Sequence, residues 1–149
     1  MIKIADYLSL DRITILKETS KERALWELIH LLSKSGIITD IDEFEKAIFE
    51  RENIMSTSIG LGIAVPHVRL TTVNEMAMAI GVSRTGIDYK AFDDMLVYII
   101  IMIAAPAGTH RQYLNFLAKI ALLLKNDTVR EGILKSQTPQ QIVDVLKMY

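Results

Sequence analysis

The sequence predicts an α/β fold in which a mixed β-sheet is sandwiched by helices. Two observations lead to this class: helical periodicity at both ends of the chain, and strand-like runs between them. The length of 149 residues suits a single domain spanning residues 1–149. Apolar residues make up 50% of the chain, which is enough for a sizeable core and excludes a disordered polypeptide.

The first part of the chain predicts one strand and two helices. The β-branched segment 11–17 predicts the strand, and Ser20 can cap a helix whose apolar residues recur with a 3.6-residue period. A second helix is expected from Asp40, with Glu43 as its capping-box partner. The helical spacing of the apolar residues in this second helix continues to Arg51. Its side chain either extends outward to solvent or binds an anion.

The middle of the chain predicts the rest of the sheet. Small and turn-forming residues over 53–70 predict a loop that leads into a short strand at 62–65. Further strands are expected at 76–83 and 96–105, separated by a turn that contains Gly86. The run 96–105 has almost no polar alternation, which indicates a central strand covered on both faces.

Three helices are expected in the last part of the chain. Thr109, followed three residues later by Gln112, predicts a capping box at the start of the first. Two shorter helices are expected near 128–135 and 138–147, with Pro139 in the first turn of the last one. The helix after Thr109 is expected to pack through Tyr113, Leu114, Leu117, Ile120, Ala121 and Leu124.

Charge and composition exclude several functions. Lys plus Arg number 17 and Asp plus Glu 18, so the basic excess that a nucleic-acid or anionic-membrane binder needs is missing. The absence of Cys excludes disulfides, thiolate zinc sites and cysteine nucleophiles. Residues 1–7 carry no signal-peptide core, and the apolar run 95–105 is far shorter than the roughly 20 residues of a membrane span. We therefore expect a cytoplasmic protein with no membrane insertion and no nucleic-acid partner.

Each of the three histidines has a distinct setting. His30 falls on the polar face of the first helix, so we expect it at the surface. Pro66 fixes its own φ and biases Val65 toward an extended backbone, so His67 follows in a constrained position at a strand end. A Gly-rich turn lies beside it, where the backbone can approach a ligand; the alternative is a histidine that only caps a strand. His110 falls at a helix start, where free N–H groups favour an anion, although polar residues are common there without a ligand.

Taken together, Arg51, His67 and His110 suit a phosphoryl group. A neutral imidazole nitrogen can accept a phosphoryl group, and an arginine can clamp its oxygens in a bidentate manner. A second histidine can donate a hydrogen bond or hold the correct tautomer. Two candidate histidines without a third ligand at suitable spacing argue against a metal site, and no cofactor is expected.

These residues lie in a segment with a family signature. Residues 51–67, Arg-Glu-Asn-Ile-Met-Ser-Thr-Ser-Ile-Gly-Leu-Gly-Ile-Ala-Val-Pro-His, resemble the active-site signature of type-2 enzyme IIA domains. These domains belong to the bacterial phosphoenolpyruvate:sugar phosphotransferase system and include fructose, mannitol and nitrogen-regulatory branches. Ala105-Pro106 followed by His110 resembles the family's second histidine, and the resemblance covers nearly the whole chain.

The resemblance implies a phosphohistidine relay. His67 matches the histidine that takes phosphate on Nε2 from the phosphorylated histidine-containing phosphocarrier protein and passes it to an enzyme IIB. Arg51 and His110 match positions that support the phosphoryl group, and Thr57 matches the signature threonine near the site. We expect docking of a carrier protein, with at least one of Ile59, Leu61 and Ile63 exposed beside His67.

Three departures from the family pattern narrow this expectation. Ser58 stands where the signature usually has glycine, and Arg111 follows His110 where leucine is usual, which affects the partner surface. Leu61 stands where mannitol-type members have an acidic residue, which disfavours the mannitol branch.

The leading interpretation is a free-standing phosphocarrier enzyme IIA. One alternative is a nitrogen-regulatory enzyme IIA that binds partner proteins in a phosphorylation-dependent way. A second alternative is a regulatory module that no longer carries phosphate, against which the intact set of Arg51, His67 and His110 argues.

Overall fold

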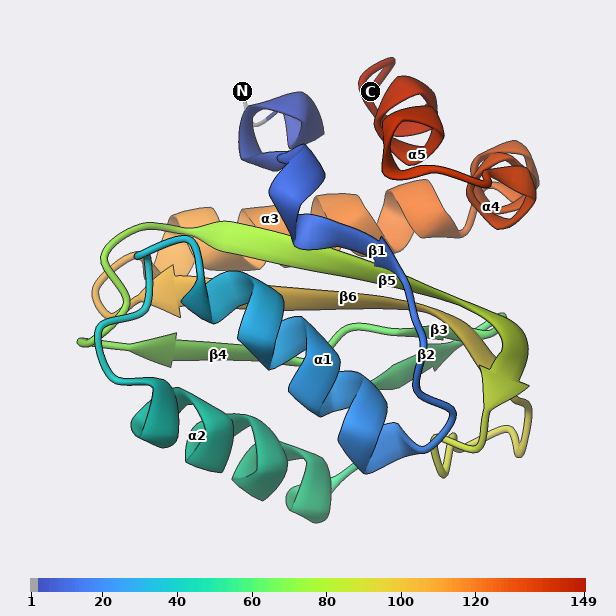
Figure 1. The fold of residues 1–149 in the computed structure, drawn as a ribbon. Coiled ribbons are helices and arrows are strands. Elements are labelled where there is room, and N and C mark those ends of the chain that lie inside the picture. Colours follow the sequence, from blue (N-terminus) through green and yellow to red (C-terminus); the bar gives the residue numbers. More distant parts are fainter. Residues whose placement is uncertain (1–2) are drawn as a thin grey trace.

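In the computed structural model, which describes residues 3–149, a mixed six-stranded sheet lies between helices on both faces (Figure 1). Met1 and Ile2 of the amino-terminal segment lie outside the described residues. The helices are α1 (Lys21–Ser33) and α2 (Ile41–Ile54) on one face, and α3 (His110–Leu124), α4 (Asp127–Lys135) and α5 (Pro139–Leu146) on the other. This arrangement confirms the predicted α/β class. None of the helices in residues 3–149 has both the length and the apolar character needed to cross a bilayer.

The strands are β1 (Ile13–Ile15), β2 (Ser58–Gly60), β3 (Ile63–Ala64), β4 (His67–Leu70), β5 (Ala77–Ile87) and β6 (Val97–Pro106). The sheet has the strand order β1-β5-β6-β3-β2, with β4 also paired to β6. β1 is parallel to β5, β5 is antiparallel to β6, and both β3 and β4 are parallel to β6. β6 is almost entirely buried, which confirms the predicted central strand.

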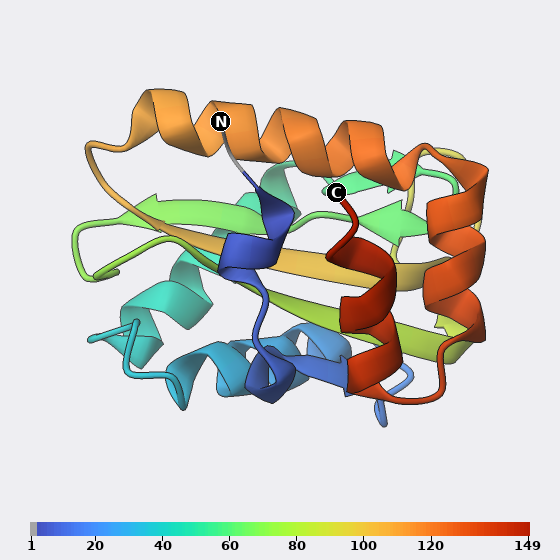
Figure 2. The same cartoon turned by 90° about the horizontal axis from the view of Figure 1, so that it is seen from above.

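Two cores form because neighbouring side chains of a strand point to opposite faces of the sheet. Ala79 and Met102 of the central strands pack with α1 and α2, whereas Ile80 and Ile101 pack with α3, α4 and α5. Figure 2 shows α5 beside the amino-terminal 3-10 turns, and Ile4 of these turns is buried in the same core as α5. Burial from both sides fixes the strand register, and with it the residues that begin and end each strand.

The start of the chain and the segment 53–70 differ from the prediction. Two 3-10 turns, Ile4–Tyr7 and Leu10–Arg12, occupy the region before β1, so the strand predicted at 11–17 is shorter. The segment 53–70, predicted as a loop and one short strand, contains β2, β3 and β4. As a result His67 is the first residue of β4 and pairs with Ile103 of β6.

The N-caps predicted at Ser20 and Asp40 are confirmed, but Glu43 does not complete a capping box in the described residues, because its carboxylate accepts from the Thr72 hydroxyl at 3.3 Å. The side chains of Ser20 and Asp40 accept hydrogen bonds from backbone N–H groups in the first turns of α1 and α2. The predicted capping box at Thr109 is wrong. The Thr109 hydroxyl donates to the carbonyl oxygen of Pro106 at 2.7 Å, and the Gln112 amide donates to a tyrosine hydroxyl of the amino-terminal turn. The Thr109 hydroxyl is therefore engaged in the tight turn after β6 and does not cap α3.

Two other expectations are corrected. Leu114, predicted to face the core, is 47% exposed, and the inward position is filled by Phe116 together with Tyr113, Ile120 and Leu124. Several leucines on α3 leave the helical phase ambiguous, and packing on the sheet decides it. Gly86 lies within β5 with φ +86°, where the register with β6 shifts, so it forms an irregularity of the strand and not a separate turn.

Candidate functional site

His67 lies half-buried where the chain passes from β3 to β4. The backbone N–H of Ile103 donates to the carbonyl oxygen of Pro66 at 2.9 Å, which ties this turn to the central strand β6. The His67 ring packs beside the ring of Tyr113 from α3, with 5.8 Å between ring centroids. The imidazole is therefore held between the sheet and α3.

The hydrogen bond of the His67 ring defines its tautomer. Nδ1 lies 2.6 Å from the carbonyl oxygen of Val65. A carbonyl oxygen can only accept, so Nδ1 carries the proton and donates it in this contact. In the neutral ring, Nε2 is consequently the nitrogen with a free lone pair.

Burial lowers the pKa of His67 below its ordinary value of 6.5. The Val65 carbonyl counteracts part of this effect, the Arg51 guanidinium adds to it, and the Glu52 carboxylate opposes it. The imidazole is therefore neutral at pH 7 and above. A neutral ring is the form that can act as a nucleophile through Nε2.

A cavity of about 530 Å³ beside His67 is basic and apolar in character. Arg51 reaches it from the last turn of α2, and Arg69 reaches it from β4, where it shares the face of His67 because strand side chains alternate. The Arg69 guanidinium lies 5.2 Å from the centroid of the Tyr113 ring, a cation–π distance. The complete lining is Ala47, Arg51, His67, Val68, Arg69, Leu70, Ala107, Gly108, Tyr113, Leu114 and Leu117.

Arg51 is held at the carboxyl end of α2. Its Nη1 donates to the carbonyl oxygen of Met55 at 2.8 Å, and its side chain is half-buried. Arg51 and His67 also line a second, smaller cavity together with Thr57 and Ile59. The structure thus brings together Arg51, His67 and Thr57 of the predicted site.

Thr57 is buried, and its polar groups are engaged with two residues that the sequence reasoning missed. Its backbone N–H and its hydroxyl both donate to the carboxylate of Glu52, and its hydroxyl oxygen lies 3.1 Å from the hydroxyl of Tyr89. Lys21 of α1 completes the cluster, with Nζ 3.4 Å from Glu52 Oε2. Glu52 follows Arg51 in the signature, and that adjacency was the available signal; Lys21 and Tyr89 carry no local signal.

His110 is the first residue of α3, as predicted, and its side chain is exposed. It lies one turn before Tyr113, the residue whose ring packs beside His67, but it does not line either cavity at His67. Arg69 is the second cationic side chain that the structure places in the cavity. Its spacing of two residues from His67 on a strand was the signal that could have found it.

The apolar residues of the Gly-rich loop are divided between core and surface. Leu61 is 56% exposed, Ile59 is half-buried and lines the smaller cavity with His67, and Ile63 is fully buried. Leu61 is exposed as expected, but it lines neither cavity at His67, so the expected position beside His67 is not confirmed for it. The exposed apolar side chain that lines the larger His67 cavity is Leu114 of α3.

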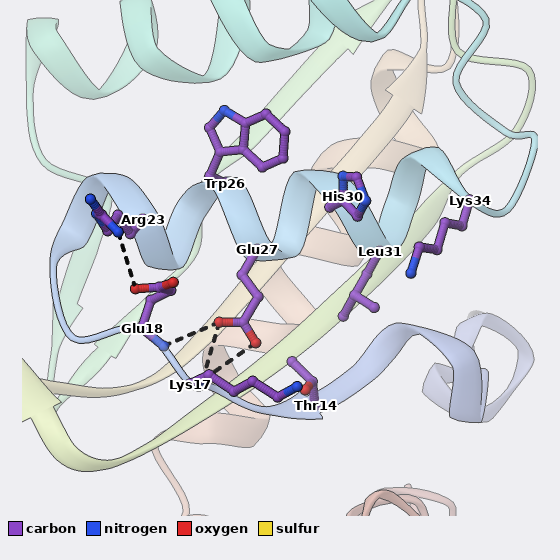
Figure 3. Close-up of a pocket in the computed structure, with 9 residues that line it drawn as sticks. All are labelled: Thr14, Lys17, Glu18, Arg23, Trp26, Glu27, His30, Leu31 and Lys34. Atoms are coloured by element: carbon purple, nitrogen blue, oxygen red, sulfur yellow. Dashed lines mark hydrogen bonds and ion pairs between the residues drawn. The ribbon is translucent and has the colours of Figure 1, made fainter.

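His30 lies on the outward side of α1, in a separate pocket lined also by Trp26 and Lys34 (Figure 3). Its ring stacks on Trp26, with 5.3 Å between centroids, and its side chain is exposed. Glu27 in the same pocket accepts hydrogen bonds from the backbone N–H groups of Lys17 and Glu18. This pocket shares no lining residue with the His67 cavities, which confirms His30 as a surface residue.

Replacing His30 by alanine is expected to change neither folding nor phosphate transfer appreciably. The only ring contact of His30 in the described part of the chain is the exposed stack on Trp26, so the free energy of unfolding should change by no more than about 0.5 kcal/mol. Thermal unfolding and single-turnover transfer assays check both points. A transfer rate reduced by more than about tenfold, or 1.4 kcal/mol in the barrier, would contradict this assignment.

The side chains around His67 also indicate whether the site suits a metal ion or an anion. Within residues 3–149, His, Asp and Glu side chains form no group of three that could hold a metal ion. The cavity beside His67 instead gathers arginine, tyrosine and apolar side chains. Such a lining favours an anion over a metal cation.

The fold is a mixed sheet between two helical layers, and the site is a neutral histidine at a strand start beside arginines, an arrangement that suits an anionic group such as a phosphoryl group. Residues 6–149 match the family described as "Phosphoenolpyruvate-dependent sugar phosphotransferase system, EIIA 2". The chain belongs to this family, as the signature at residues 51–67 predicts.

Individual relatives agree with the family match. The fructose-specific EIIA component of Haloferax volcanii is 33% identical over 127 residues, covering 85% of this chain and 82% of that protein. The fructose-specific EIIABC component of Bacillus subtilis is 31% identical over 149 residues, and the chain spans only 24% of its length. The crystal structure of nitrogen regulatory protein IIA-Ntr from Neisseria meningitidis superposes with a TM-score of 0.89 at 25% identity, covering 96% of this chain and 98% of that one.

Proposed function

We propose that residues 1–149 act as one enzyme IIA unit that carries phosphate on His67. The donor is the phosphorylated histidine-containing phosphocarrier protein, and the acceptor is an enzyme IIB. The observation that carries this proposal is the 2.6 Å hydrogen bond from His67 Nδ1 to the Val65 carbonyl, which leaves the Nε2 lone pair free. Because phosphoenolpyruvate is made inside cells, the proposal places the chain in the cytoplasm.

The transfer conserves atoms and charge without a cofactor. The Nε2 lone pair of His67 forms a bond to the phosphorus of the donor phosphohistidine, while the donor N–P bond breaks and its electron pair returns to the donor imidazole. The proton on Nδ1 stays in place, hydrogen-bonded to Val65. In the second step an acceptor side chain on enzyme IIB attacks the same phosphorus, and the electron pair of the Nε2–P bond returns to His67.

Arg51 and His110 have different proposed roles in this transfer. Arg51 shares both cavities with His67, which supports a role for its guanidinium in stabilising the charge on the equatorial phosphoryl oxygens. His110 is exposed at the start of α3, and we assign it a supporting role at the rim, in contact with the phosphoryl group once a partner has docked. Thr57 supports the site through the buried cluster at Glu52.

The surroundings of His67 favour docking of a protein over capture of a sugar. Leu114 and Leu117 present apolar surface at the cavity, and Arg51 and Arg69 supply positive charge for a phosphoryl group. Among the described residues that line this cavity, none is a carboxylate or amide side chain, the groups that usually orient sugar hydroxyls.

We therefore expect isothermal titration of fructose into the isolated chain to give no binding heat. The phosphorylated phosphocarrier protein, titrated under the same conditions, should bind and transfer phosphate. Sugar binding in the absence of any enzyme IIB or membrane component would contradict the proposed docking function.

A nitrogen-regulatory role is the second candidate, and the superposition on the IIA-Ntr structure favours it. In that case the same phosphohistidine would control binding to partner proteins and would not feed sugar uptake. One assay separates the two: after phosphorylation of this chain, addition of a fructose enzyme IIB either drains the phosphate or leaves it on His67. The third possibility, a module that carries no phosphate, is tested by the intact-mass experiment on His67 described in the Discussion.

A further inference from the structure

Glu52 is a buried carboxylate that lies behind the site and has no role in the proposed transfer itself. Its side chain is 3% exposed. Oε2 accepts from the backbone N–H of Thr57 at 3.1 Å, and Oε1 accepts from the hydroxyls of Thr57 and Tyr89. Lys21 Nζ lies 3.4 Å from Oε2. One ammonium group and three hydrogen-bond donors thus converge on this carboxylate, which compensates for its burial.

Lys21 and Tyr89 contact each other as well as Glu52. Lys21 Nζ also lies 4.3 Å from the centroid of the Tyr89 ring, so the same cation contacts both partners. Burial, together with the neighbouring Glu52 carboxylate, raises the pKa of Tyr89, so its hydroxyl remains a donor. The cluster joins α1, α2 and the loop after β5, three elements that are distant in sequence.

A continuous series of hydrogen bonds connects this cluster to the ring of His67. Glu52 fixes both polar groups of Thr57, and the carbonyl oxygen of Thr57 accepts from the backbone N–H of Val65 at 3.0 Å. The carbonyl oxygen of Val65 then accepts from Nδ1 of His67 at 2.6 Å. Each link places the next acceptor, so a shift at Thr57 moves the carbonyl that holds the His67 proton.

We infer that Glu52 is a positioning residue for phosphate transfer, because it fixes the Thr57 segment and thereby the Val65 carbonyl that keeps the proton of His67 on Nδ1. This inference rests on the proposed function. Glu52 lies behind the reacting atoms and acts through Thr57 and Val65. Its consequence is specific: loss of the anchor lets the imidazole populate the tautomer with the proton on Nε2, in which the nucleophilic lone pair is lost.

The test compares Glu52→Gln with a matched control on the same helix. Glutamine keeps the shape, but only its amide oxygen can accept hydrogen bonds. Either the Thr57 N–H or the Thr57 and Tyr89 hydroxyls therefore face an NH₂ group that cannot accept, and Lys21 loses its counter-ion. The control is Glu50→Gln. The Glu50 carboxylate is 65% exposed, and its one ion pair within residues 3–149 is with Lys46 at 3.9 Å. Nitrogen-15 spectra of the His67 ring, recorded above its pKa, report the tautomer directly, and single-turnover transfer reports the rate.

We expect wild type and Glu50→Gln to show a single tautomer with the proton on Nδ1. Glu52→Gln should show a mixture of tautomers and a transfer rate lower by about tenfold or more. Wild-type tautomer populations in folded Glu52→Gln would overturn the inference, whatever the transfer rate. Failure of the wild-type chain to take up phosphate would instead refute the proposed function, while the tautomer comparison would still decide the role of Glu52.

A second pair of variants keeps the test decisive if Glu52→Gln does not fold. Thr57→Ser retains the hydroxyl and the backbone N–H that Glu52 holds, whereas Thr57→Val retains only the N–H. We expect the His67 ring of Thr57→Ser to show the wild-type tautomer, and Thr57→Val to shift part of the His67 population to the other tautomer. Identical ring spectra for the two variants would overturn the inference.

Discussion

Replacing His67 by alanine is expected to abolish phosphate uptake while leaving the chain folded. The imidazole supplies the only lone pair proposed to bond to phosphorus, and alanine offers no substitute. The fold should survive because His67 is half-buried and contributes one hydrogen bond and one ring contact, at a cost of about 1–3 kcal/mol. Intact mass after incubation with phosphoenolpyruvate, enzyme I and the phosphocarrier protein measures the uptake.

His30→Ala is the matched control for this experiment, because it removes an imidazole at the surface and leaves the His67 cavity unchanged. It should take up one phosphoryl group as wild type does. Phosphorylation of folded His67→Ala at the wild-type rate would place the acceptor on another residue and refute the assignment.

Arg51→Ala should give the next largest effect, a transfer rate lower by about tenfold to a hundredfold. A charge-assisted hydrogen bond to the phosphoryl oxygens is worth about 1.5–3 kcal/mol, which corresponds to this range. Arginine stays charged at all relevant pH values, so the loss should persist throughout the plateau of the pH–rate profile. Single-turnover transfer between about pH 5.5 and 8, which brackets the ordinary histidine pKa, provides the measurement.

The acid limb of that profile belongs to His67. Its lowered pKa places the midpoint of this limb below the ordinary value of 6.5, where the ring gains a proton on Nε2 and loses its lone pair. Because Arg51 contributes to the lowering, Arg51→Ala should move this limb toward higher pH. An unchanged plateau rate in Arg51→Ala would show that Arg51 does not stabilise the phosphoryl group during transfer.

His110→Gln is the comparison that separates the two supporting residues. Glutamine keeps a hydrogen-bond donor at this position but removes the imidazole, so we expect partial activity. If the transfer rate of His110→Gln equals that of wild type, the imidazole of His110 is not required, and the proposed partnership with His67 is wrong.

The sequence predicts those parts of the fold that are set by local chemistry. Ser20 and Asp40 mark the starts of α1 and α2 correctly, because a side-chain oxygen one residue before a helix satisfies its free N–H groups. Thr109 offers the same signal, yet its hydroxyl turns back to Pro106. Leu114 was predicted to pack in the core, but Phe116 is buried there instead, because the sheet beneath α3 determines which face of the helix packs inward.

The site residues also fall into those with a local sequence signal and those without one. Arg51 and His67 could be found because the signature keeps them on one continuous segment. Arg69 could have been predicted from the two-residue period of a strand, which puts its side chain on the same face as that of His67. Lys21 and Tyr89 were not, because their contacts with Glu52 depend on how α1, α2 and the segment after β5 meet in space.

The most direct test of the account is to determine which nitrogen of which histidine carries the phosphate. Nitrogen-15 NMR of the phosphorylated chain identifies the phosphorylated ring nitrogen by its coupling to phosphorus-31. The account predicts coupling at Nε2 of His67, with the proton retained on Nδ1 against the Val65 carbonyl. Phosphate on Nδ1 of His67, or on His110 or His30, would contradict it.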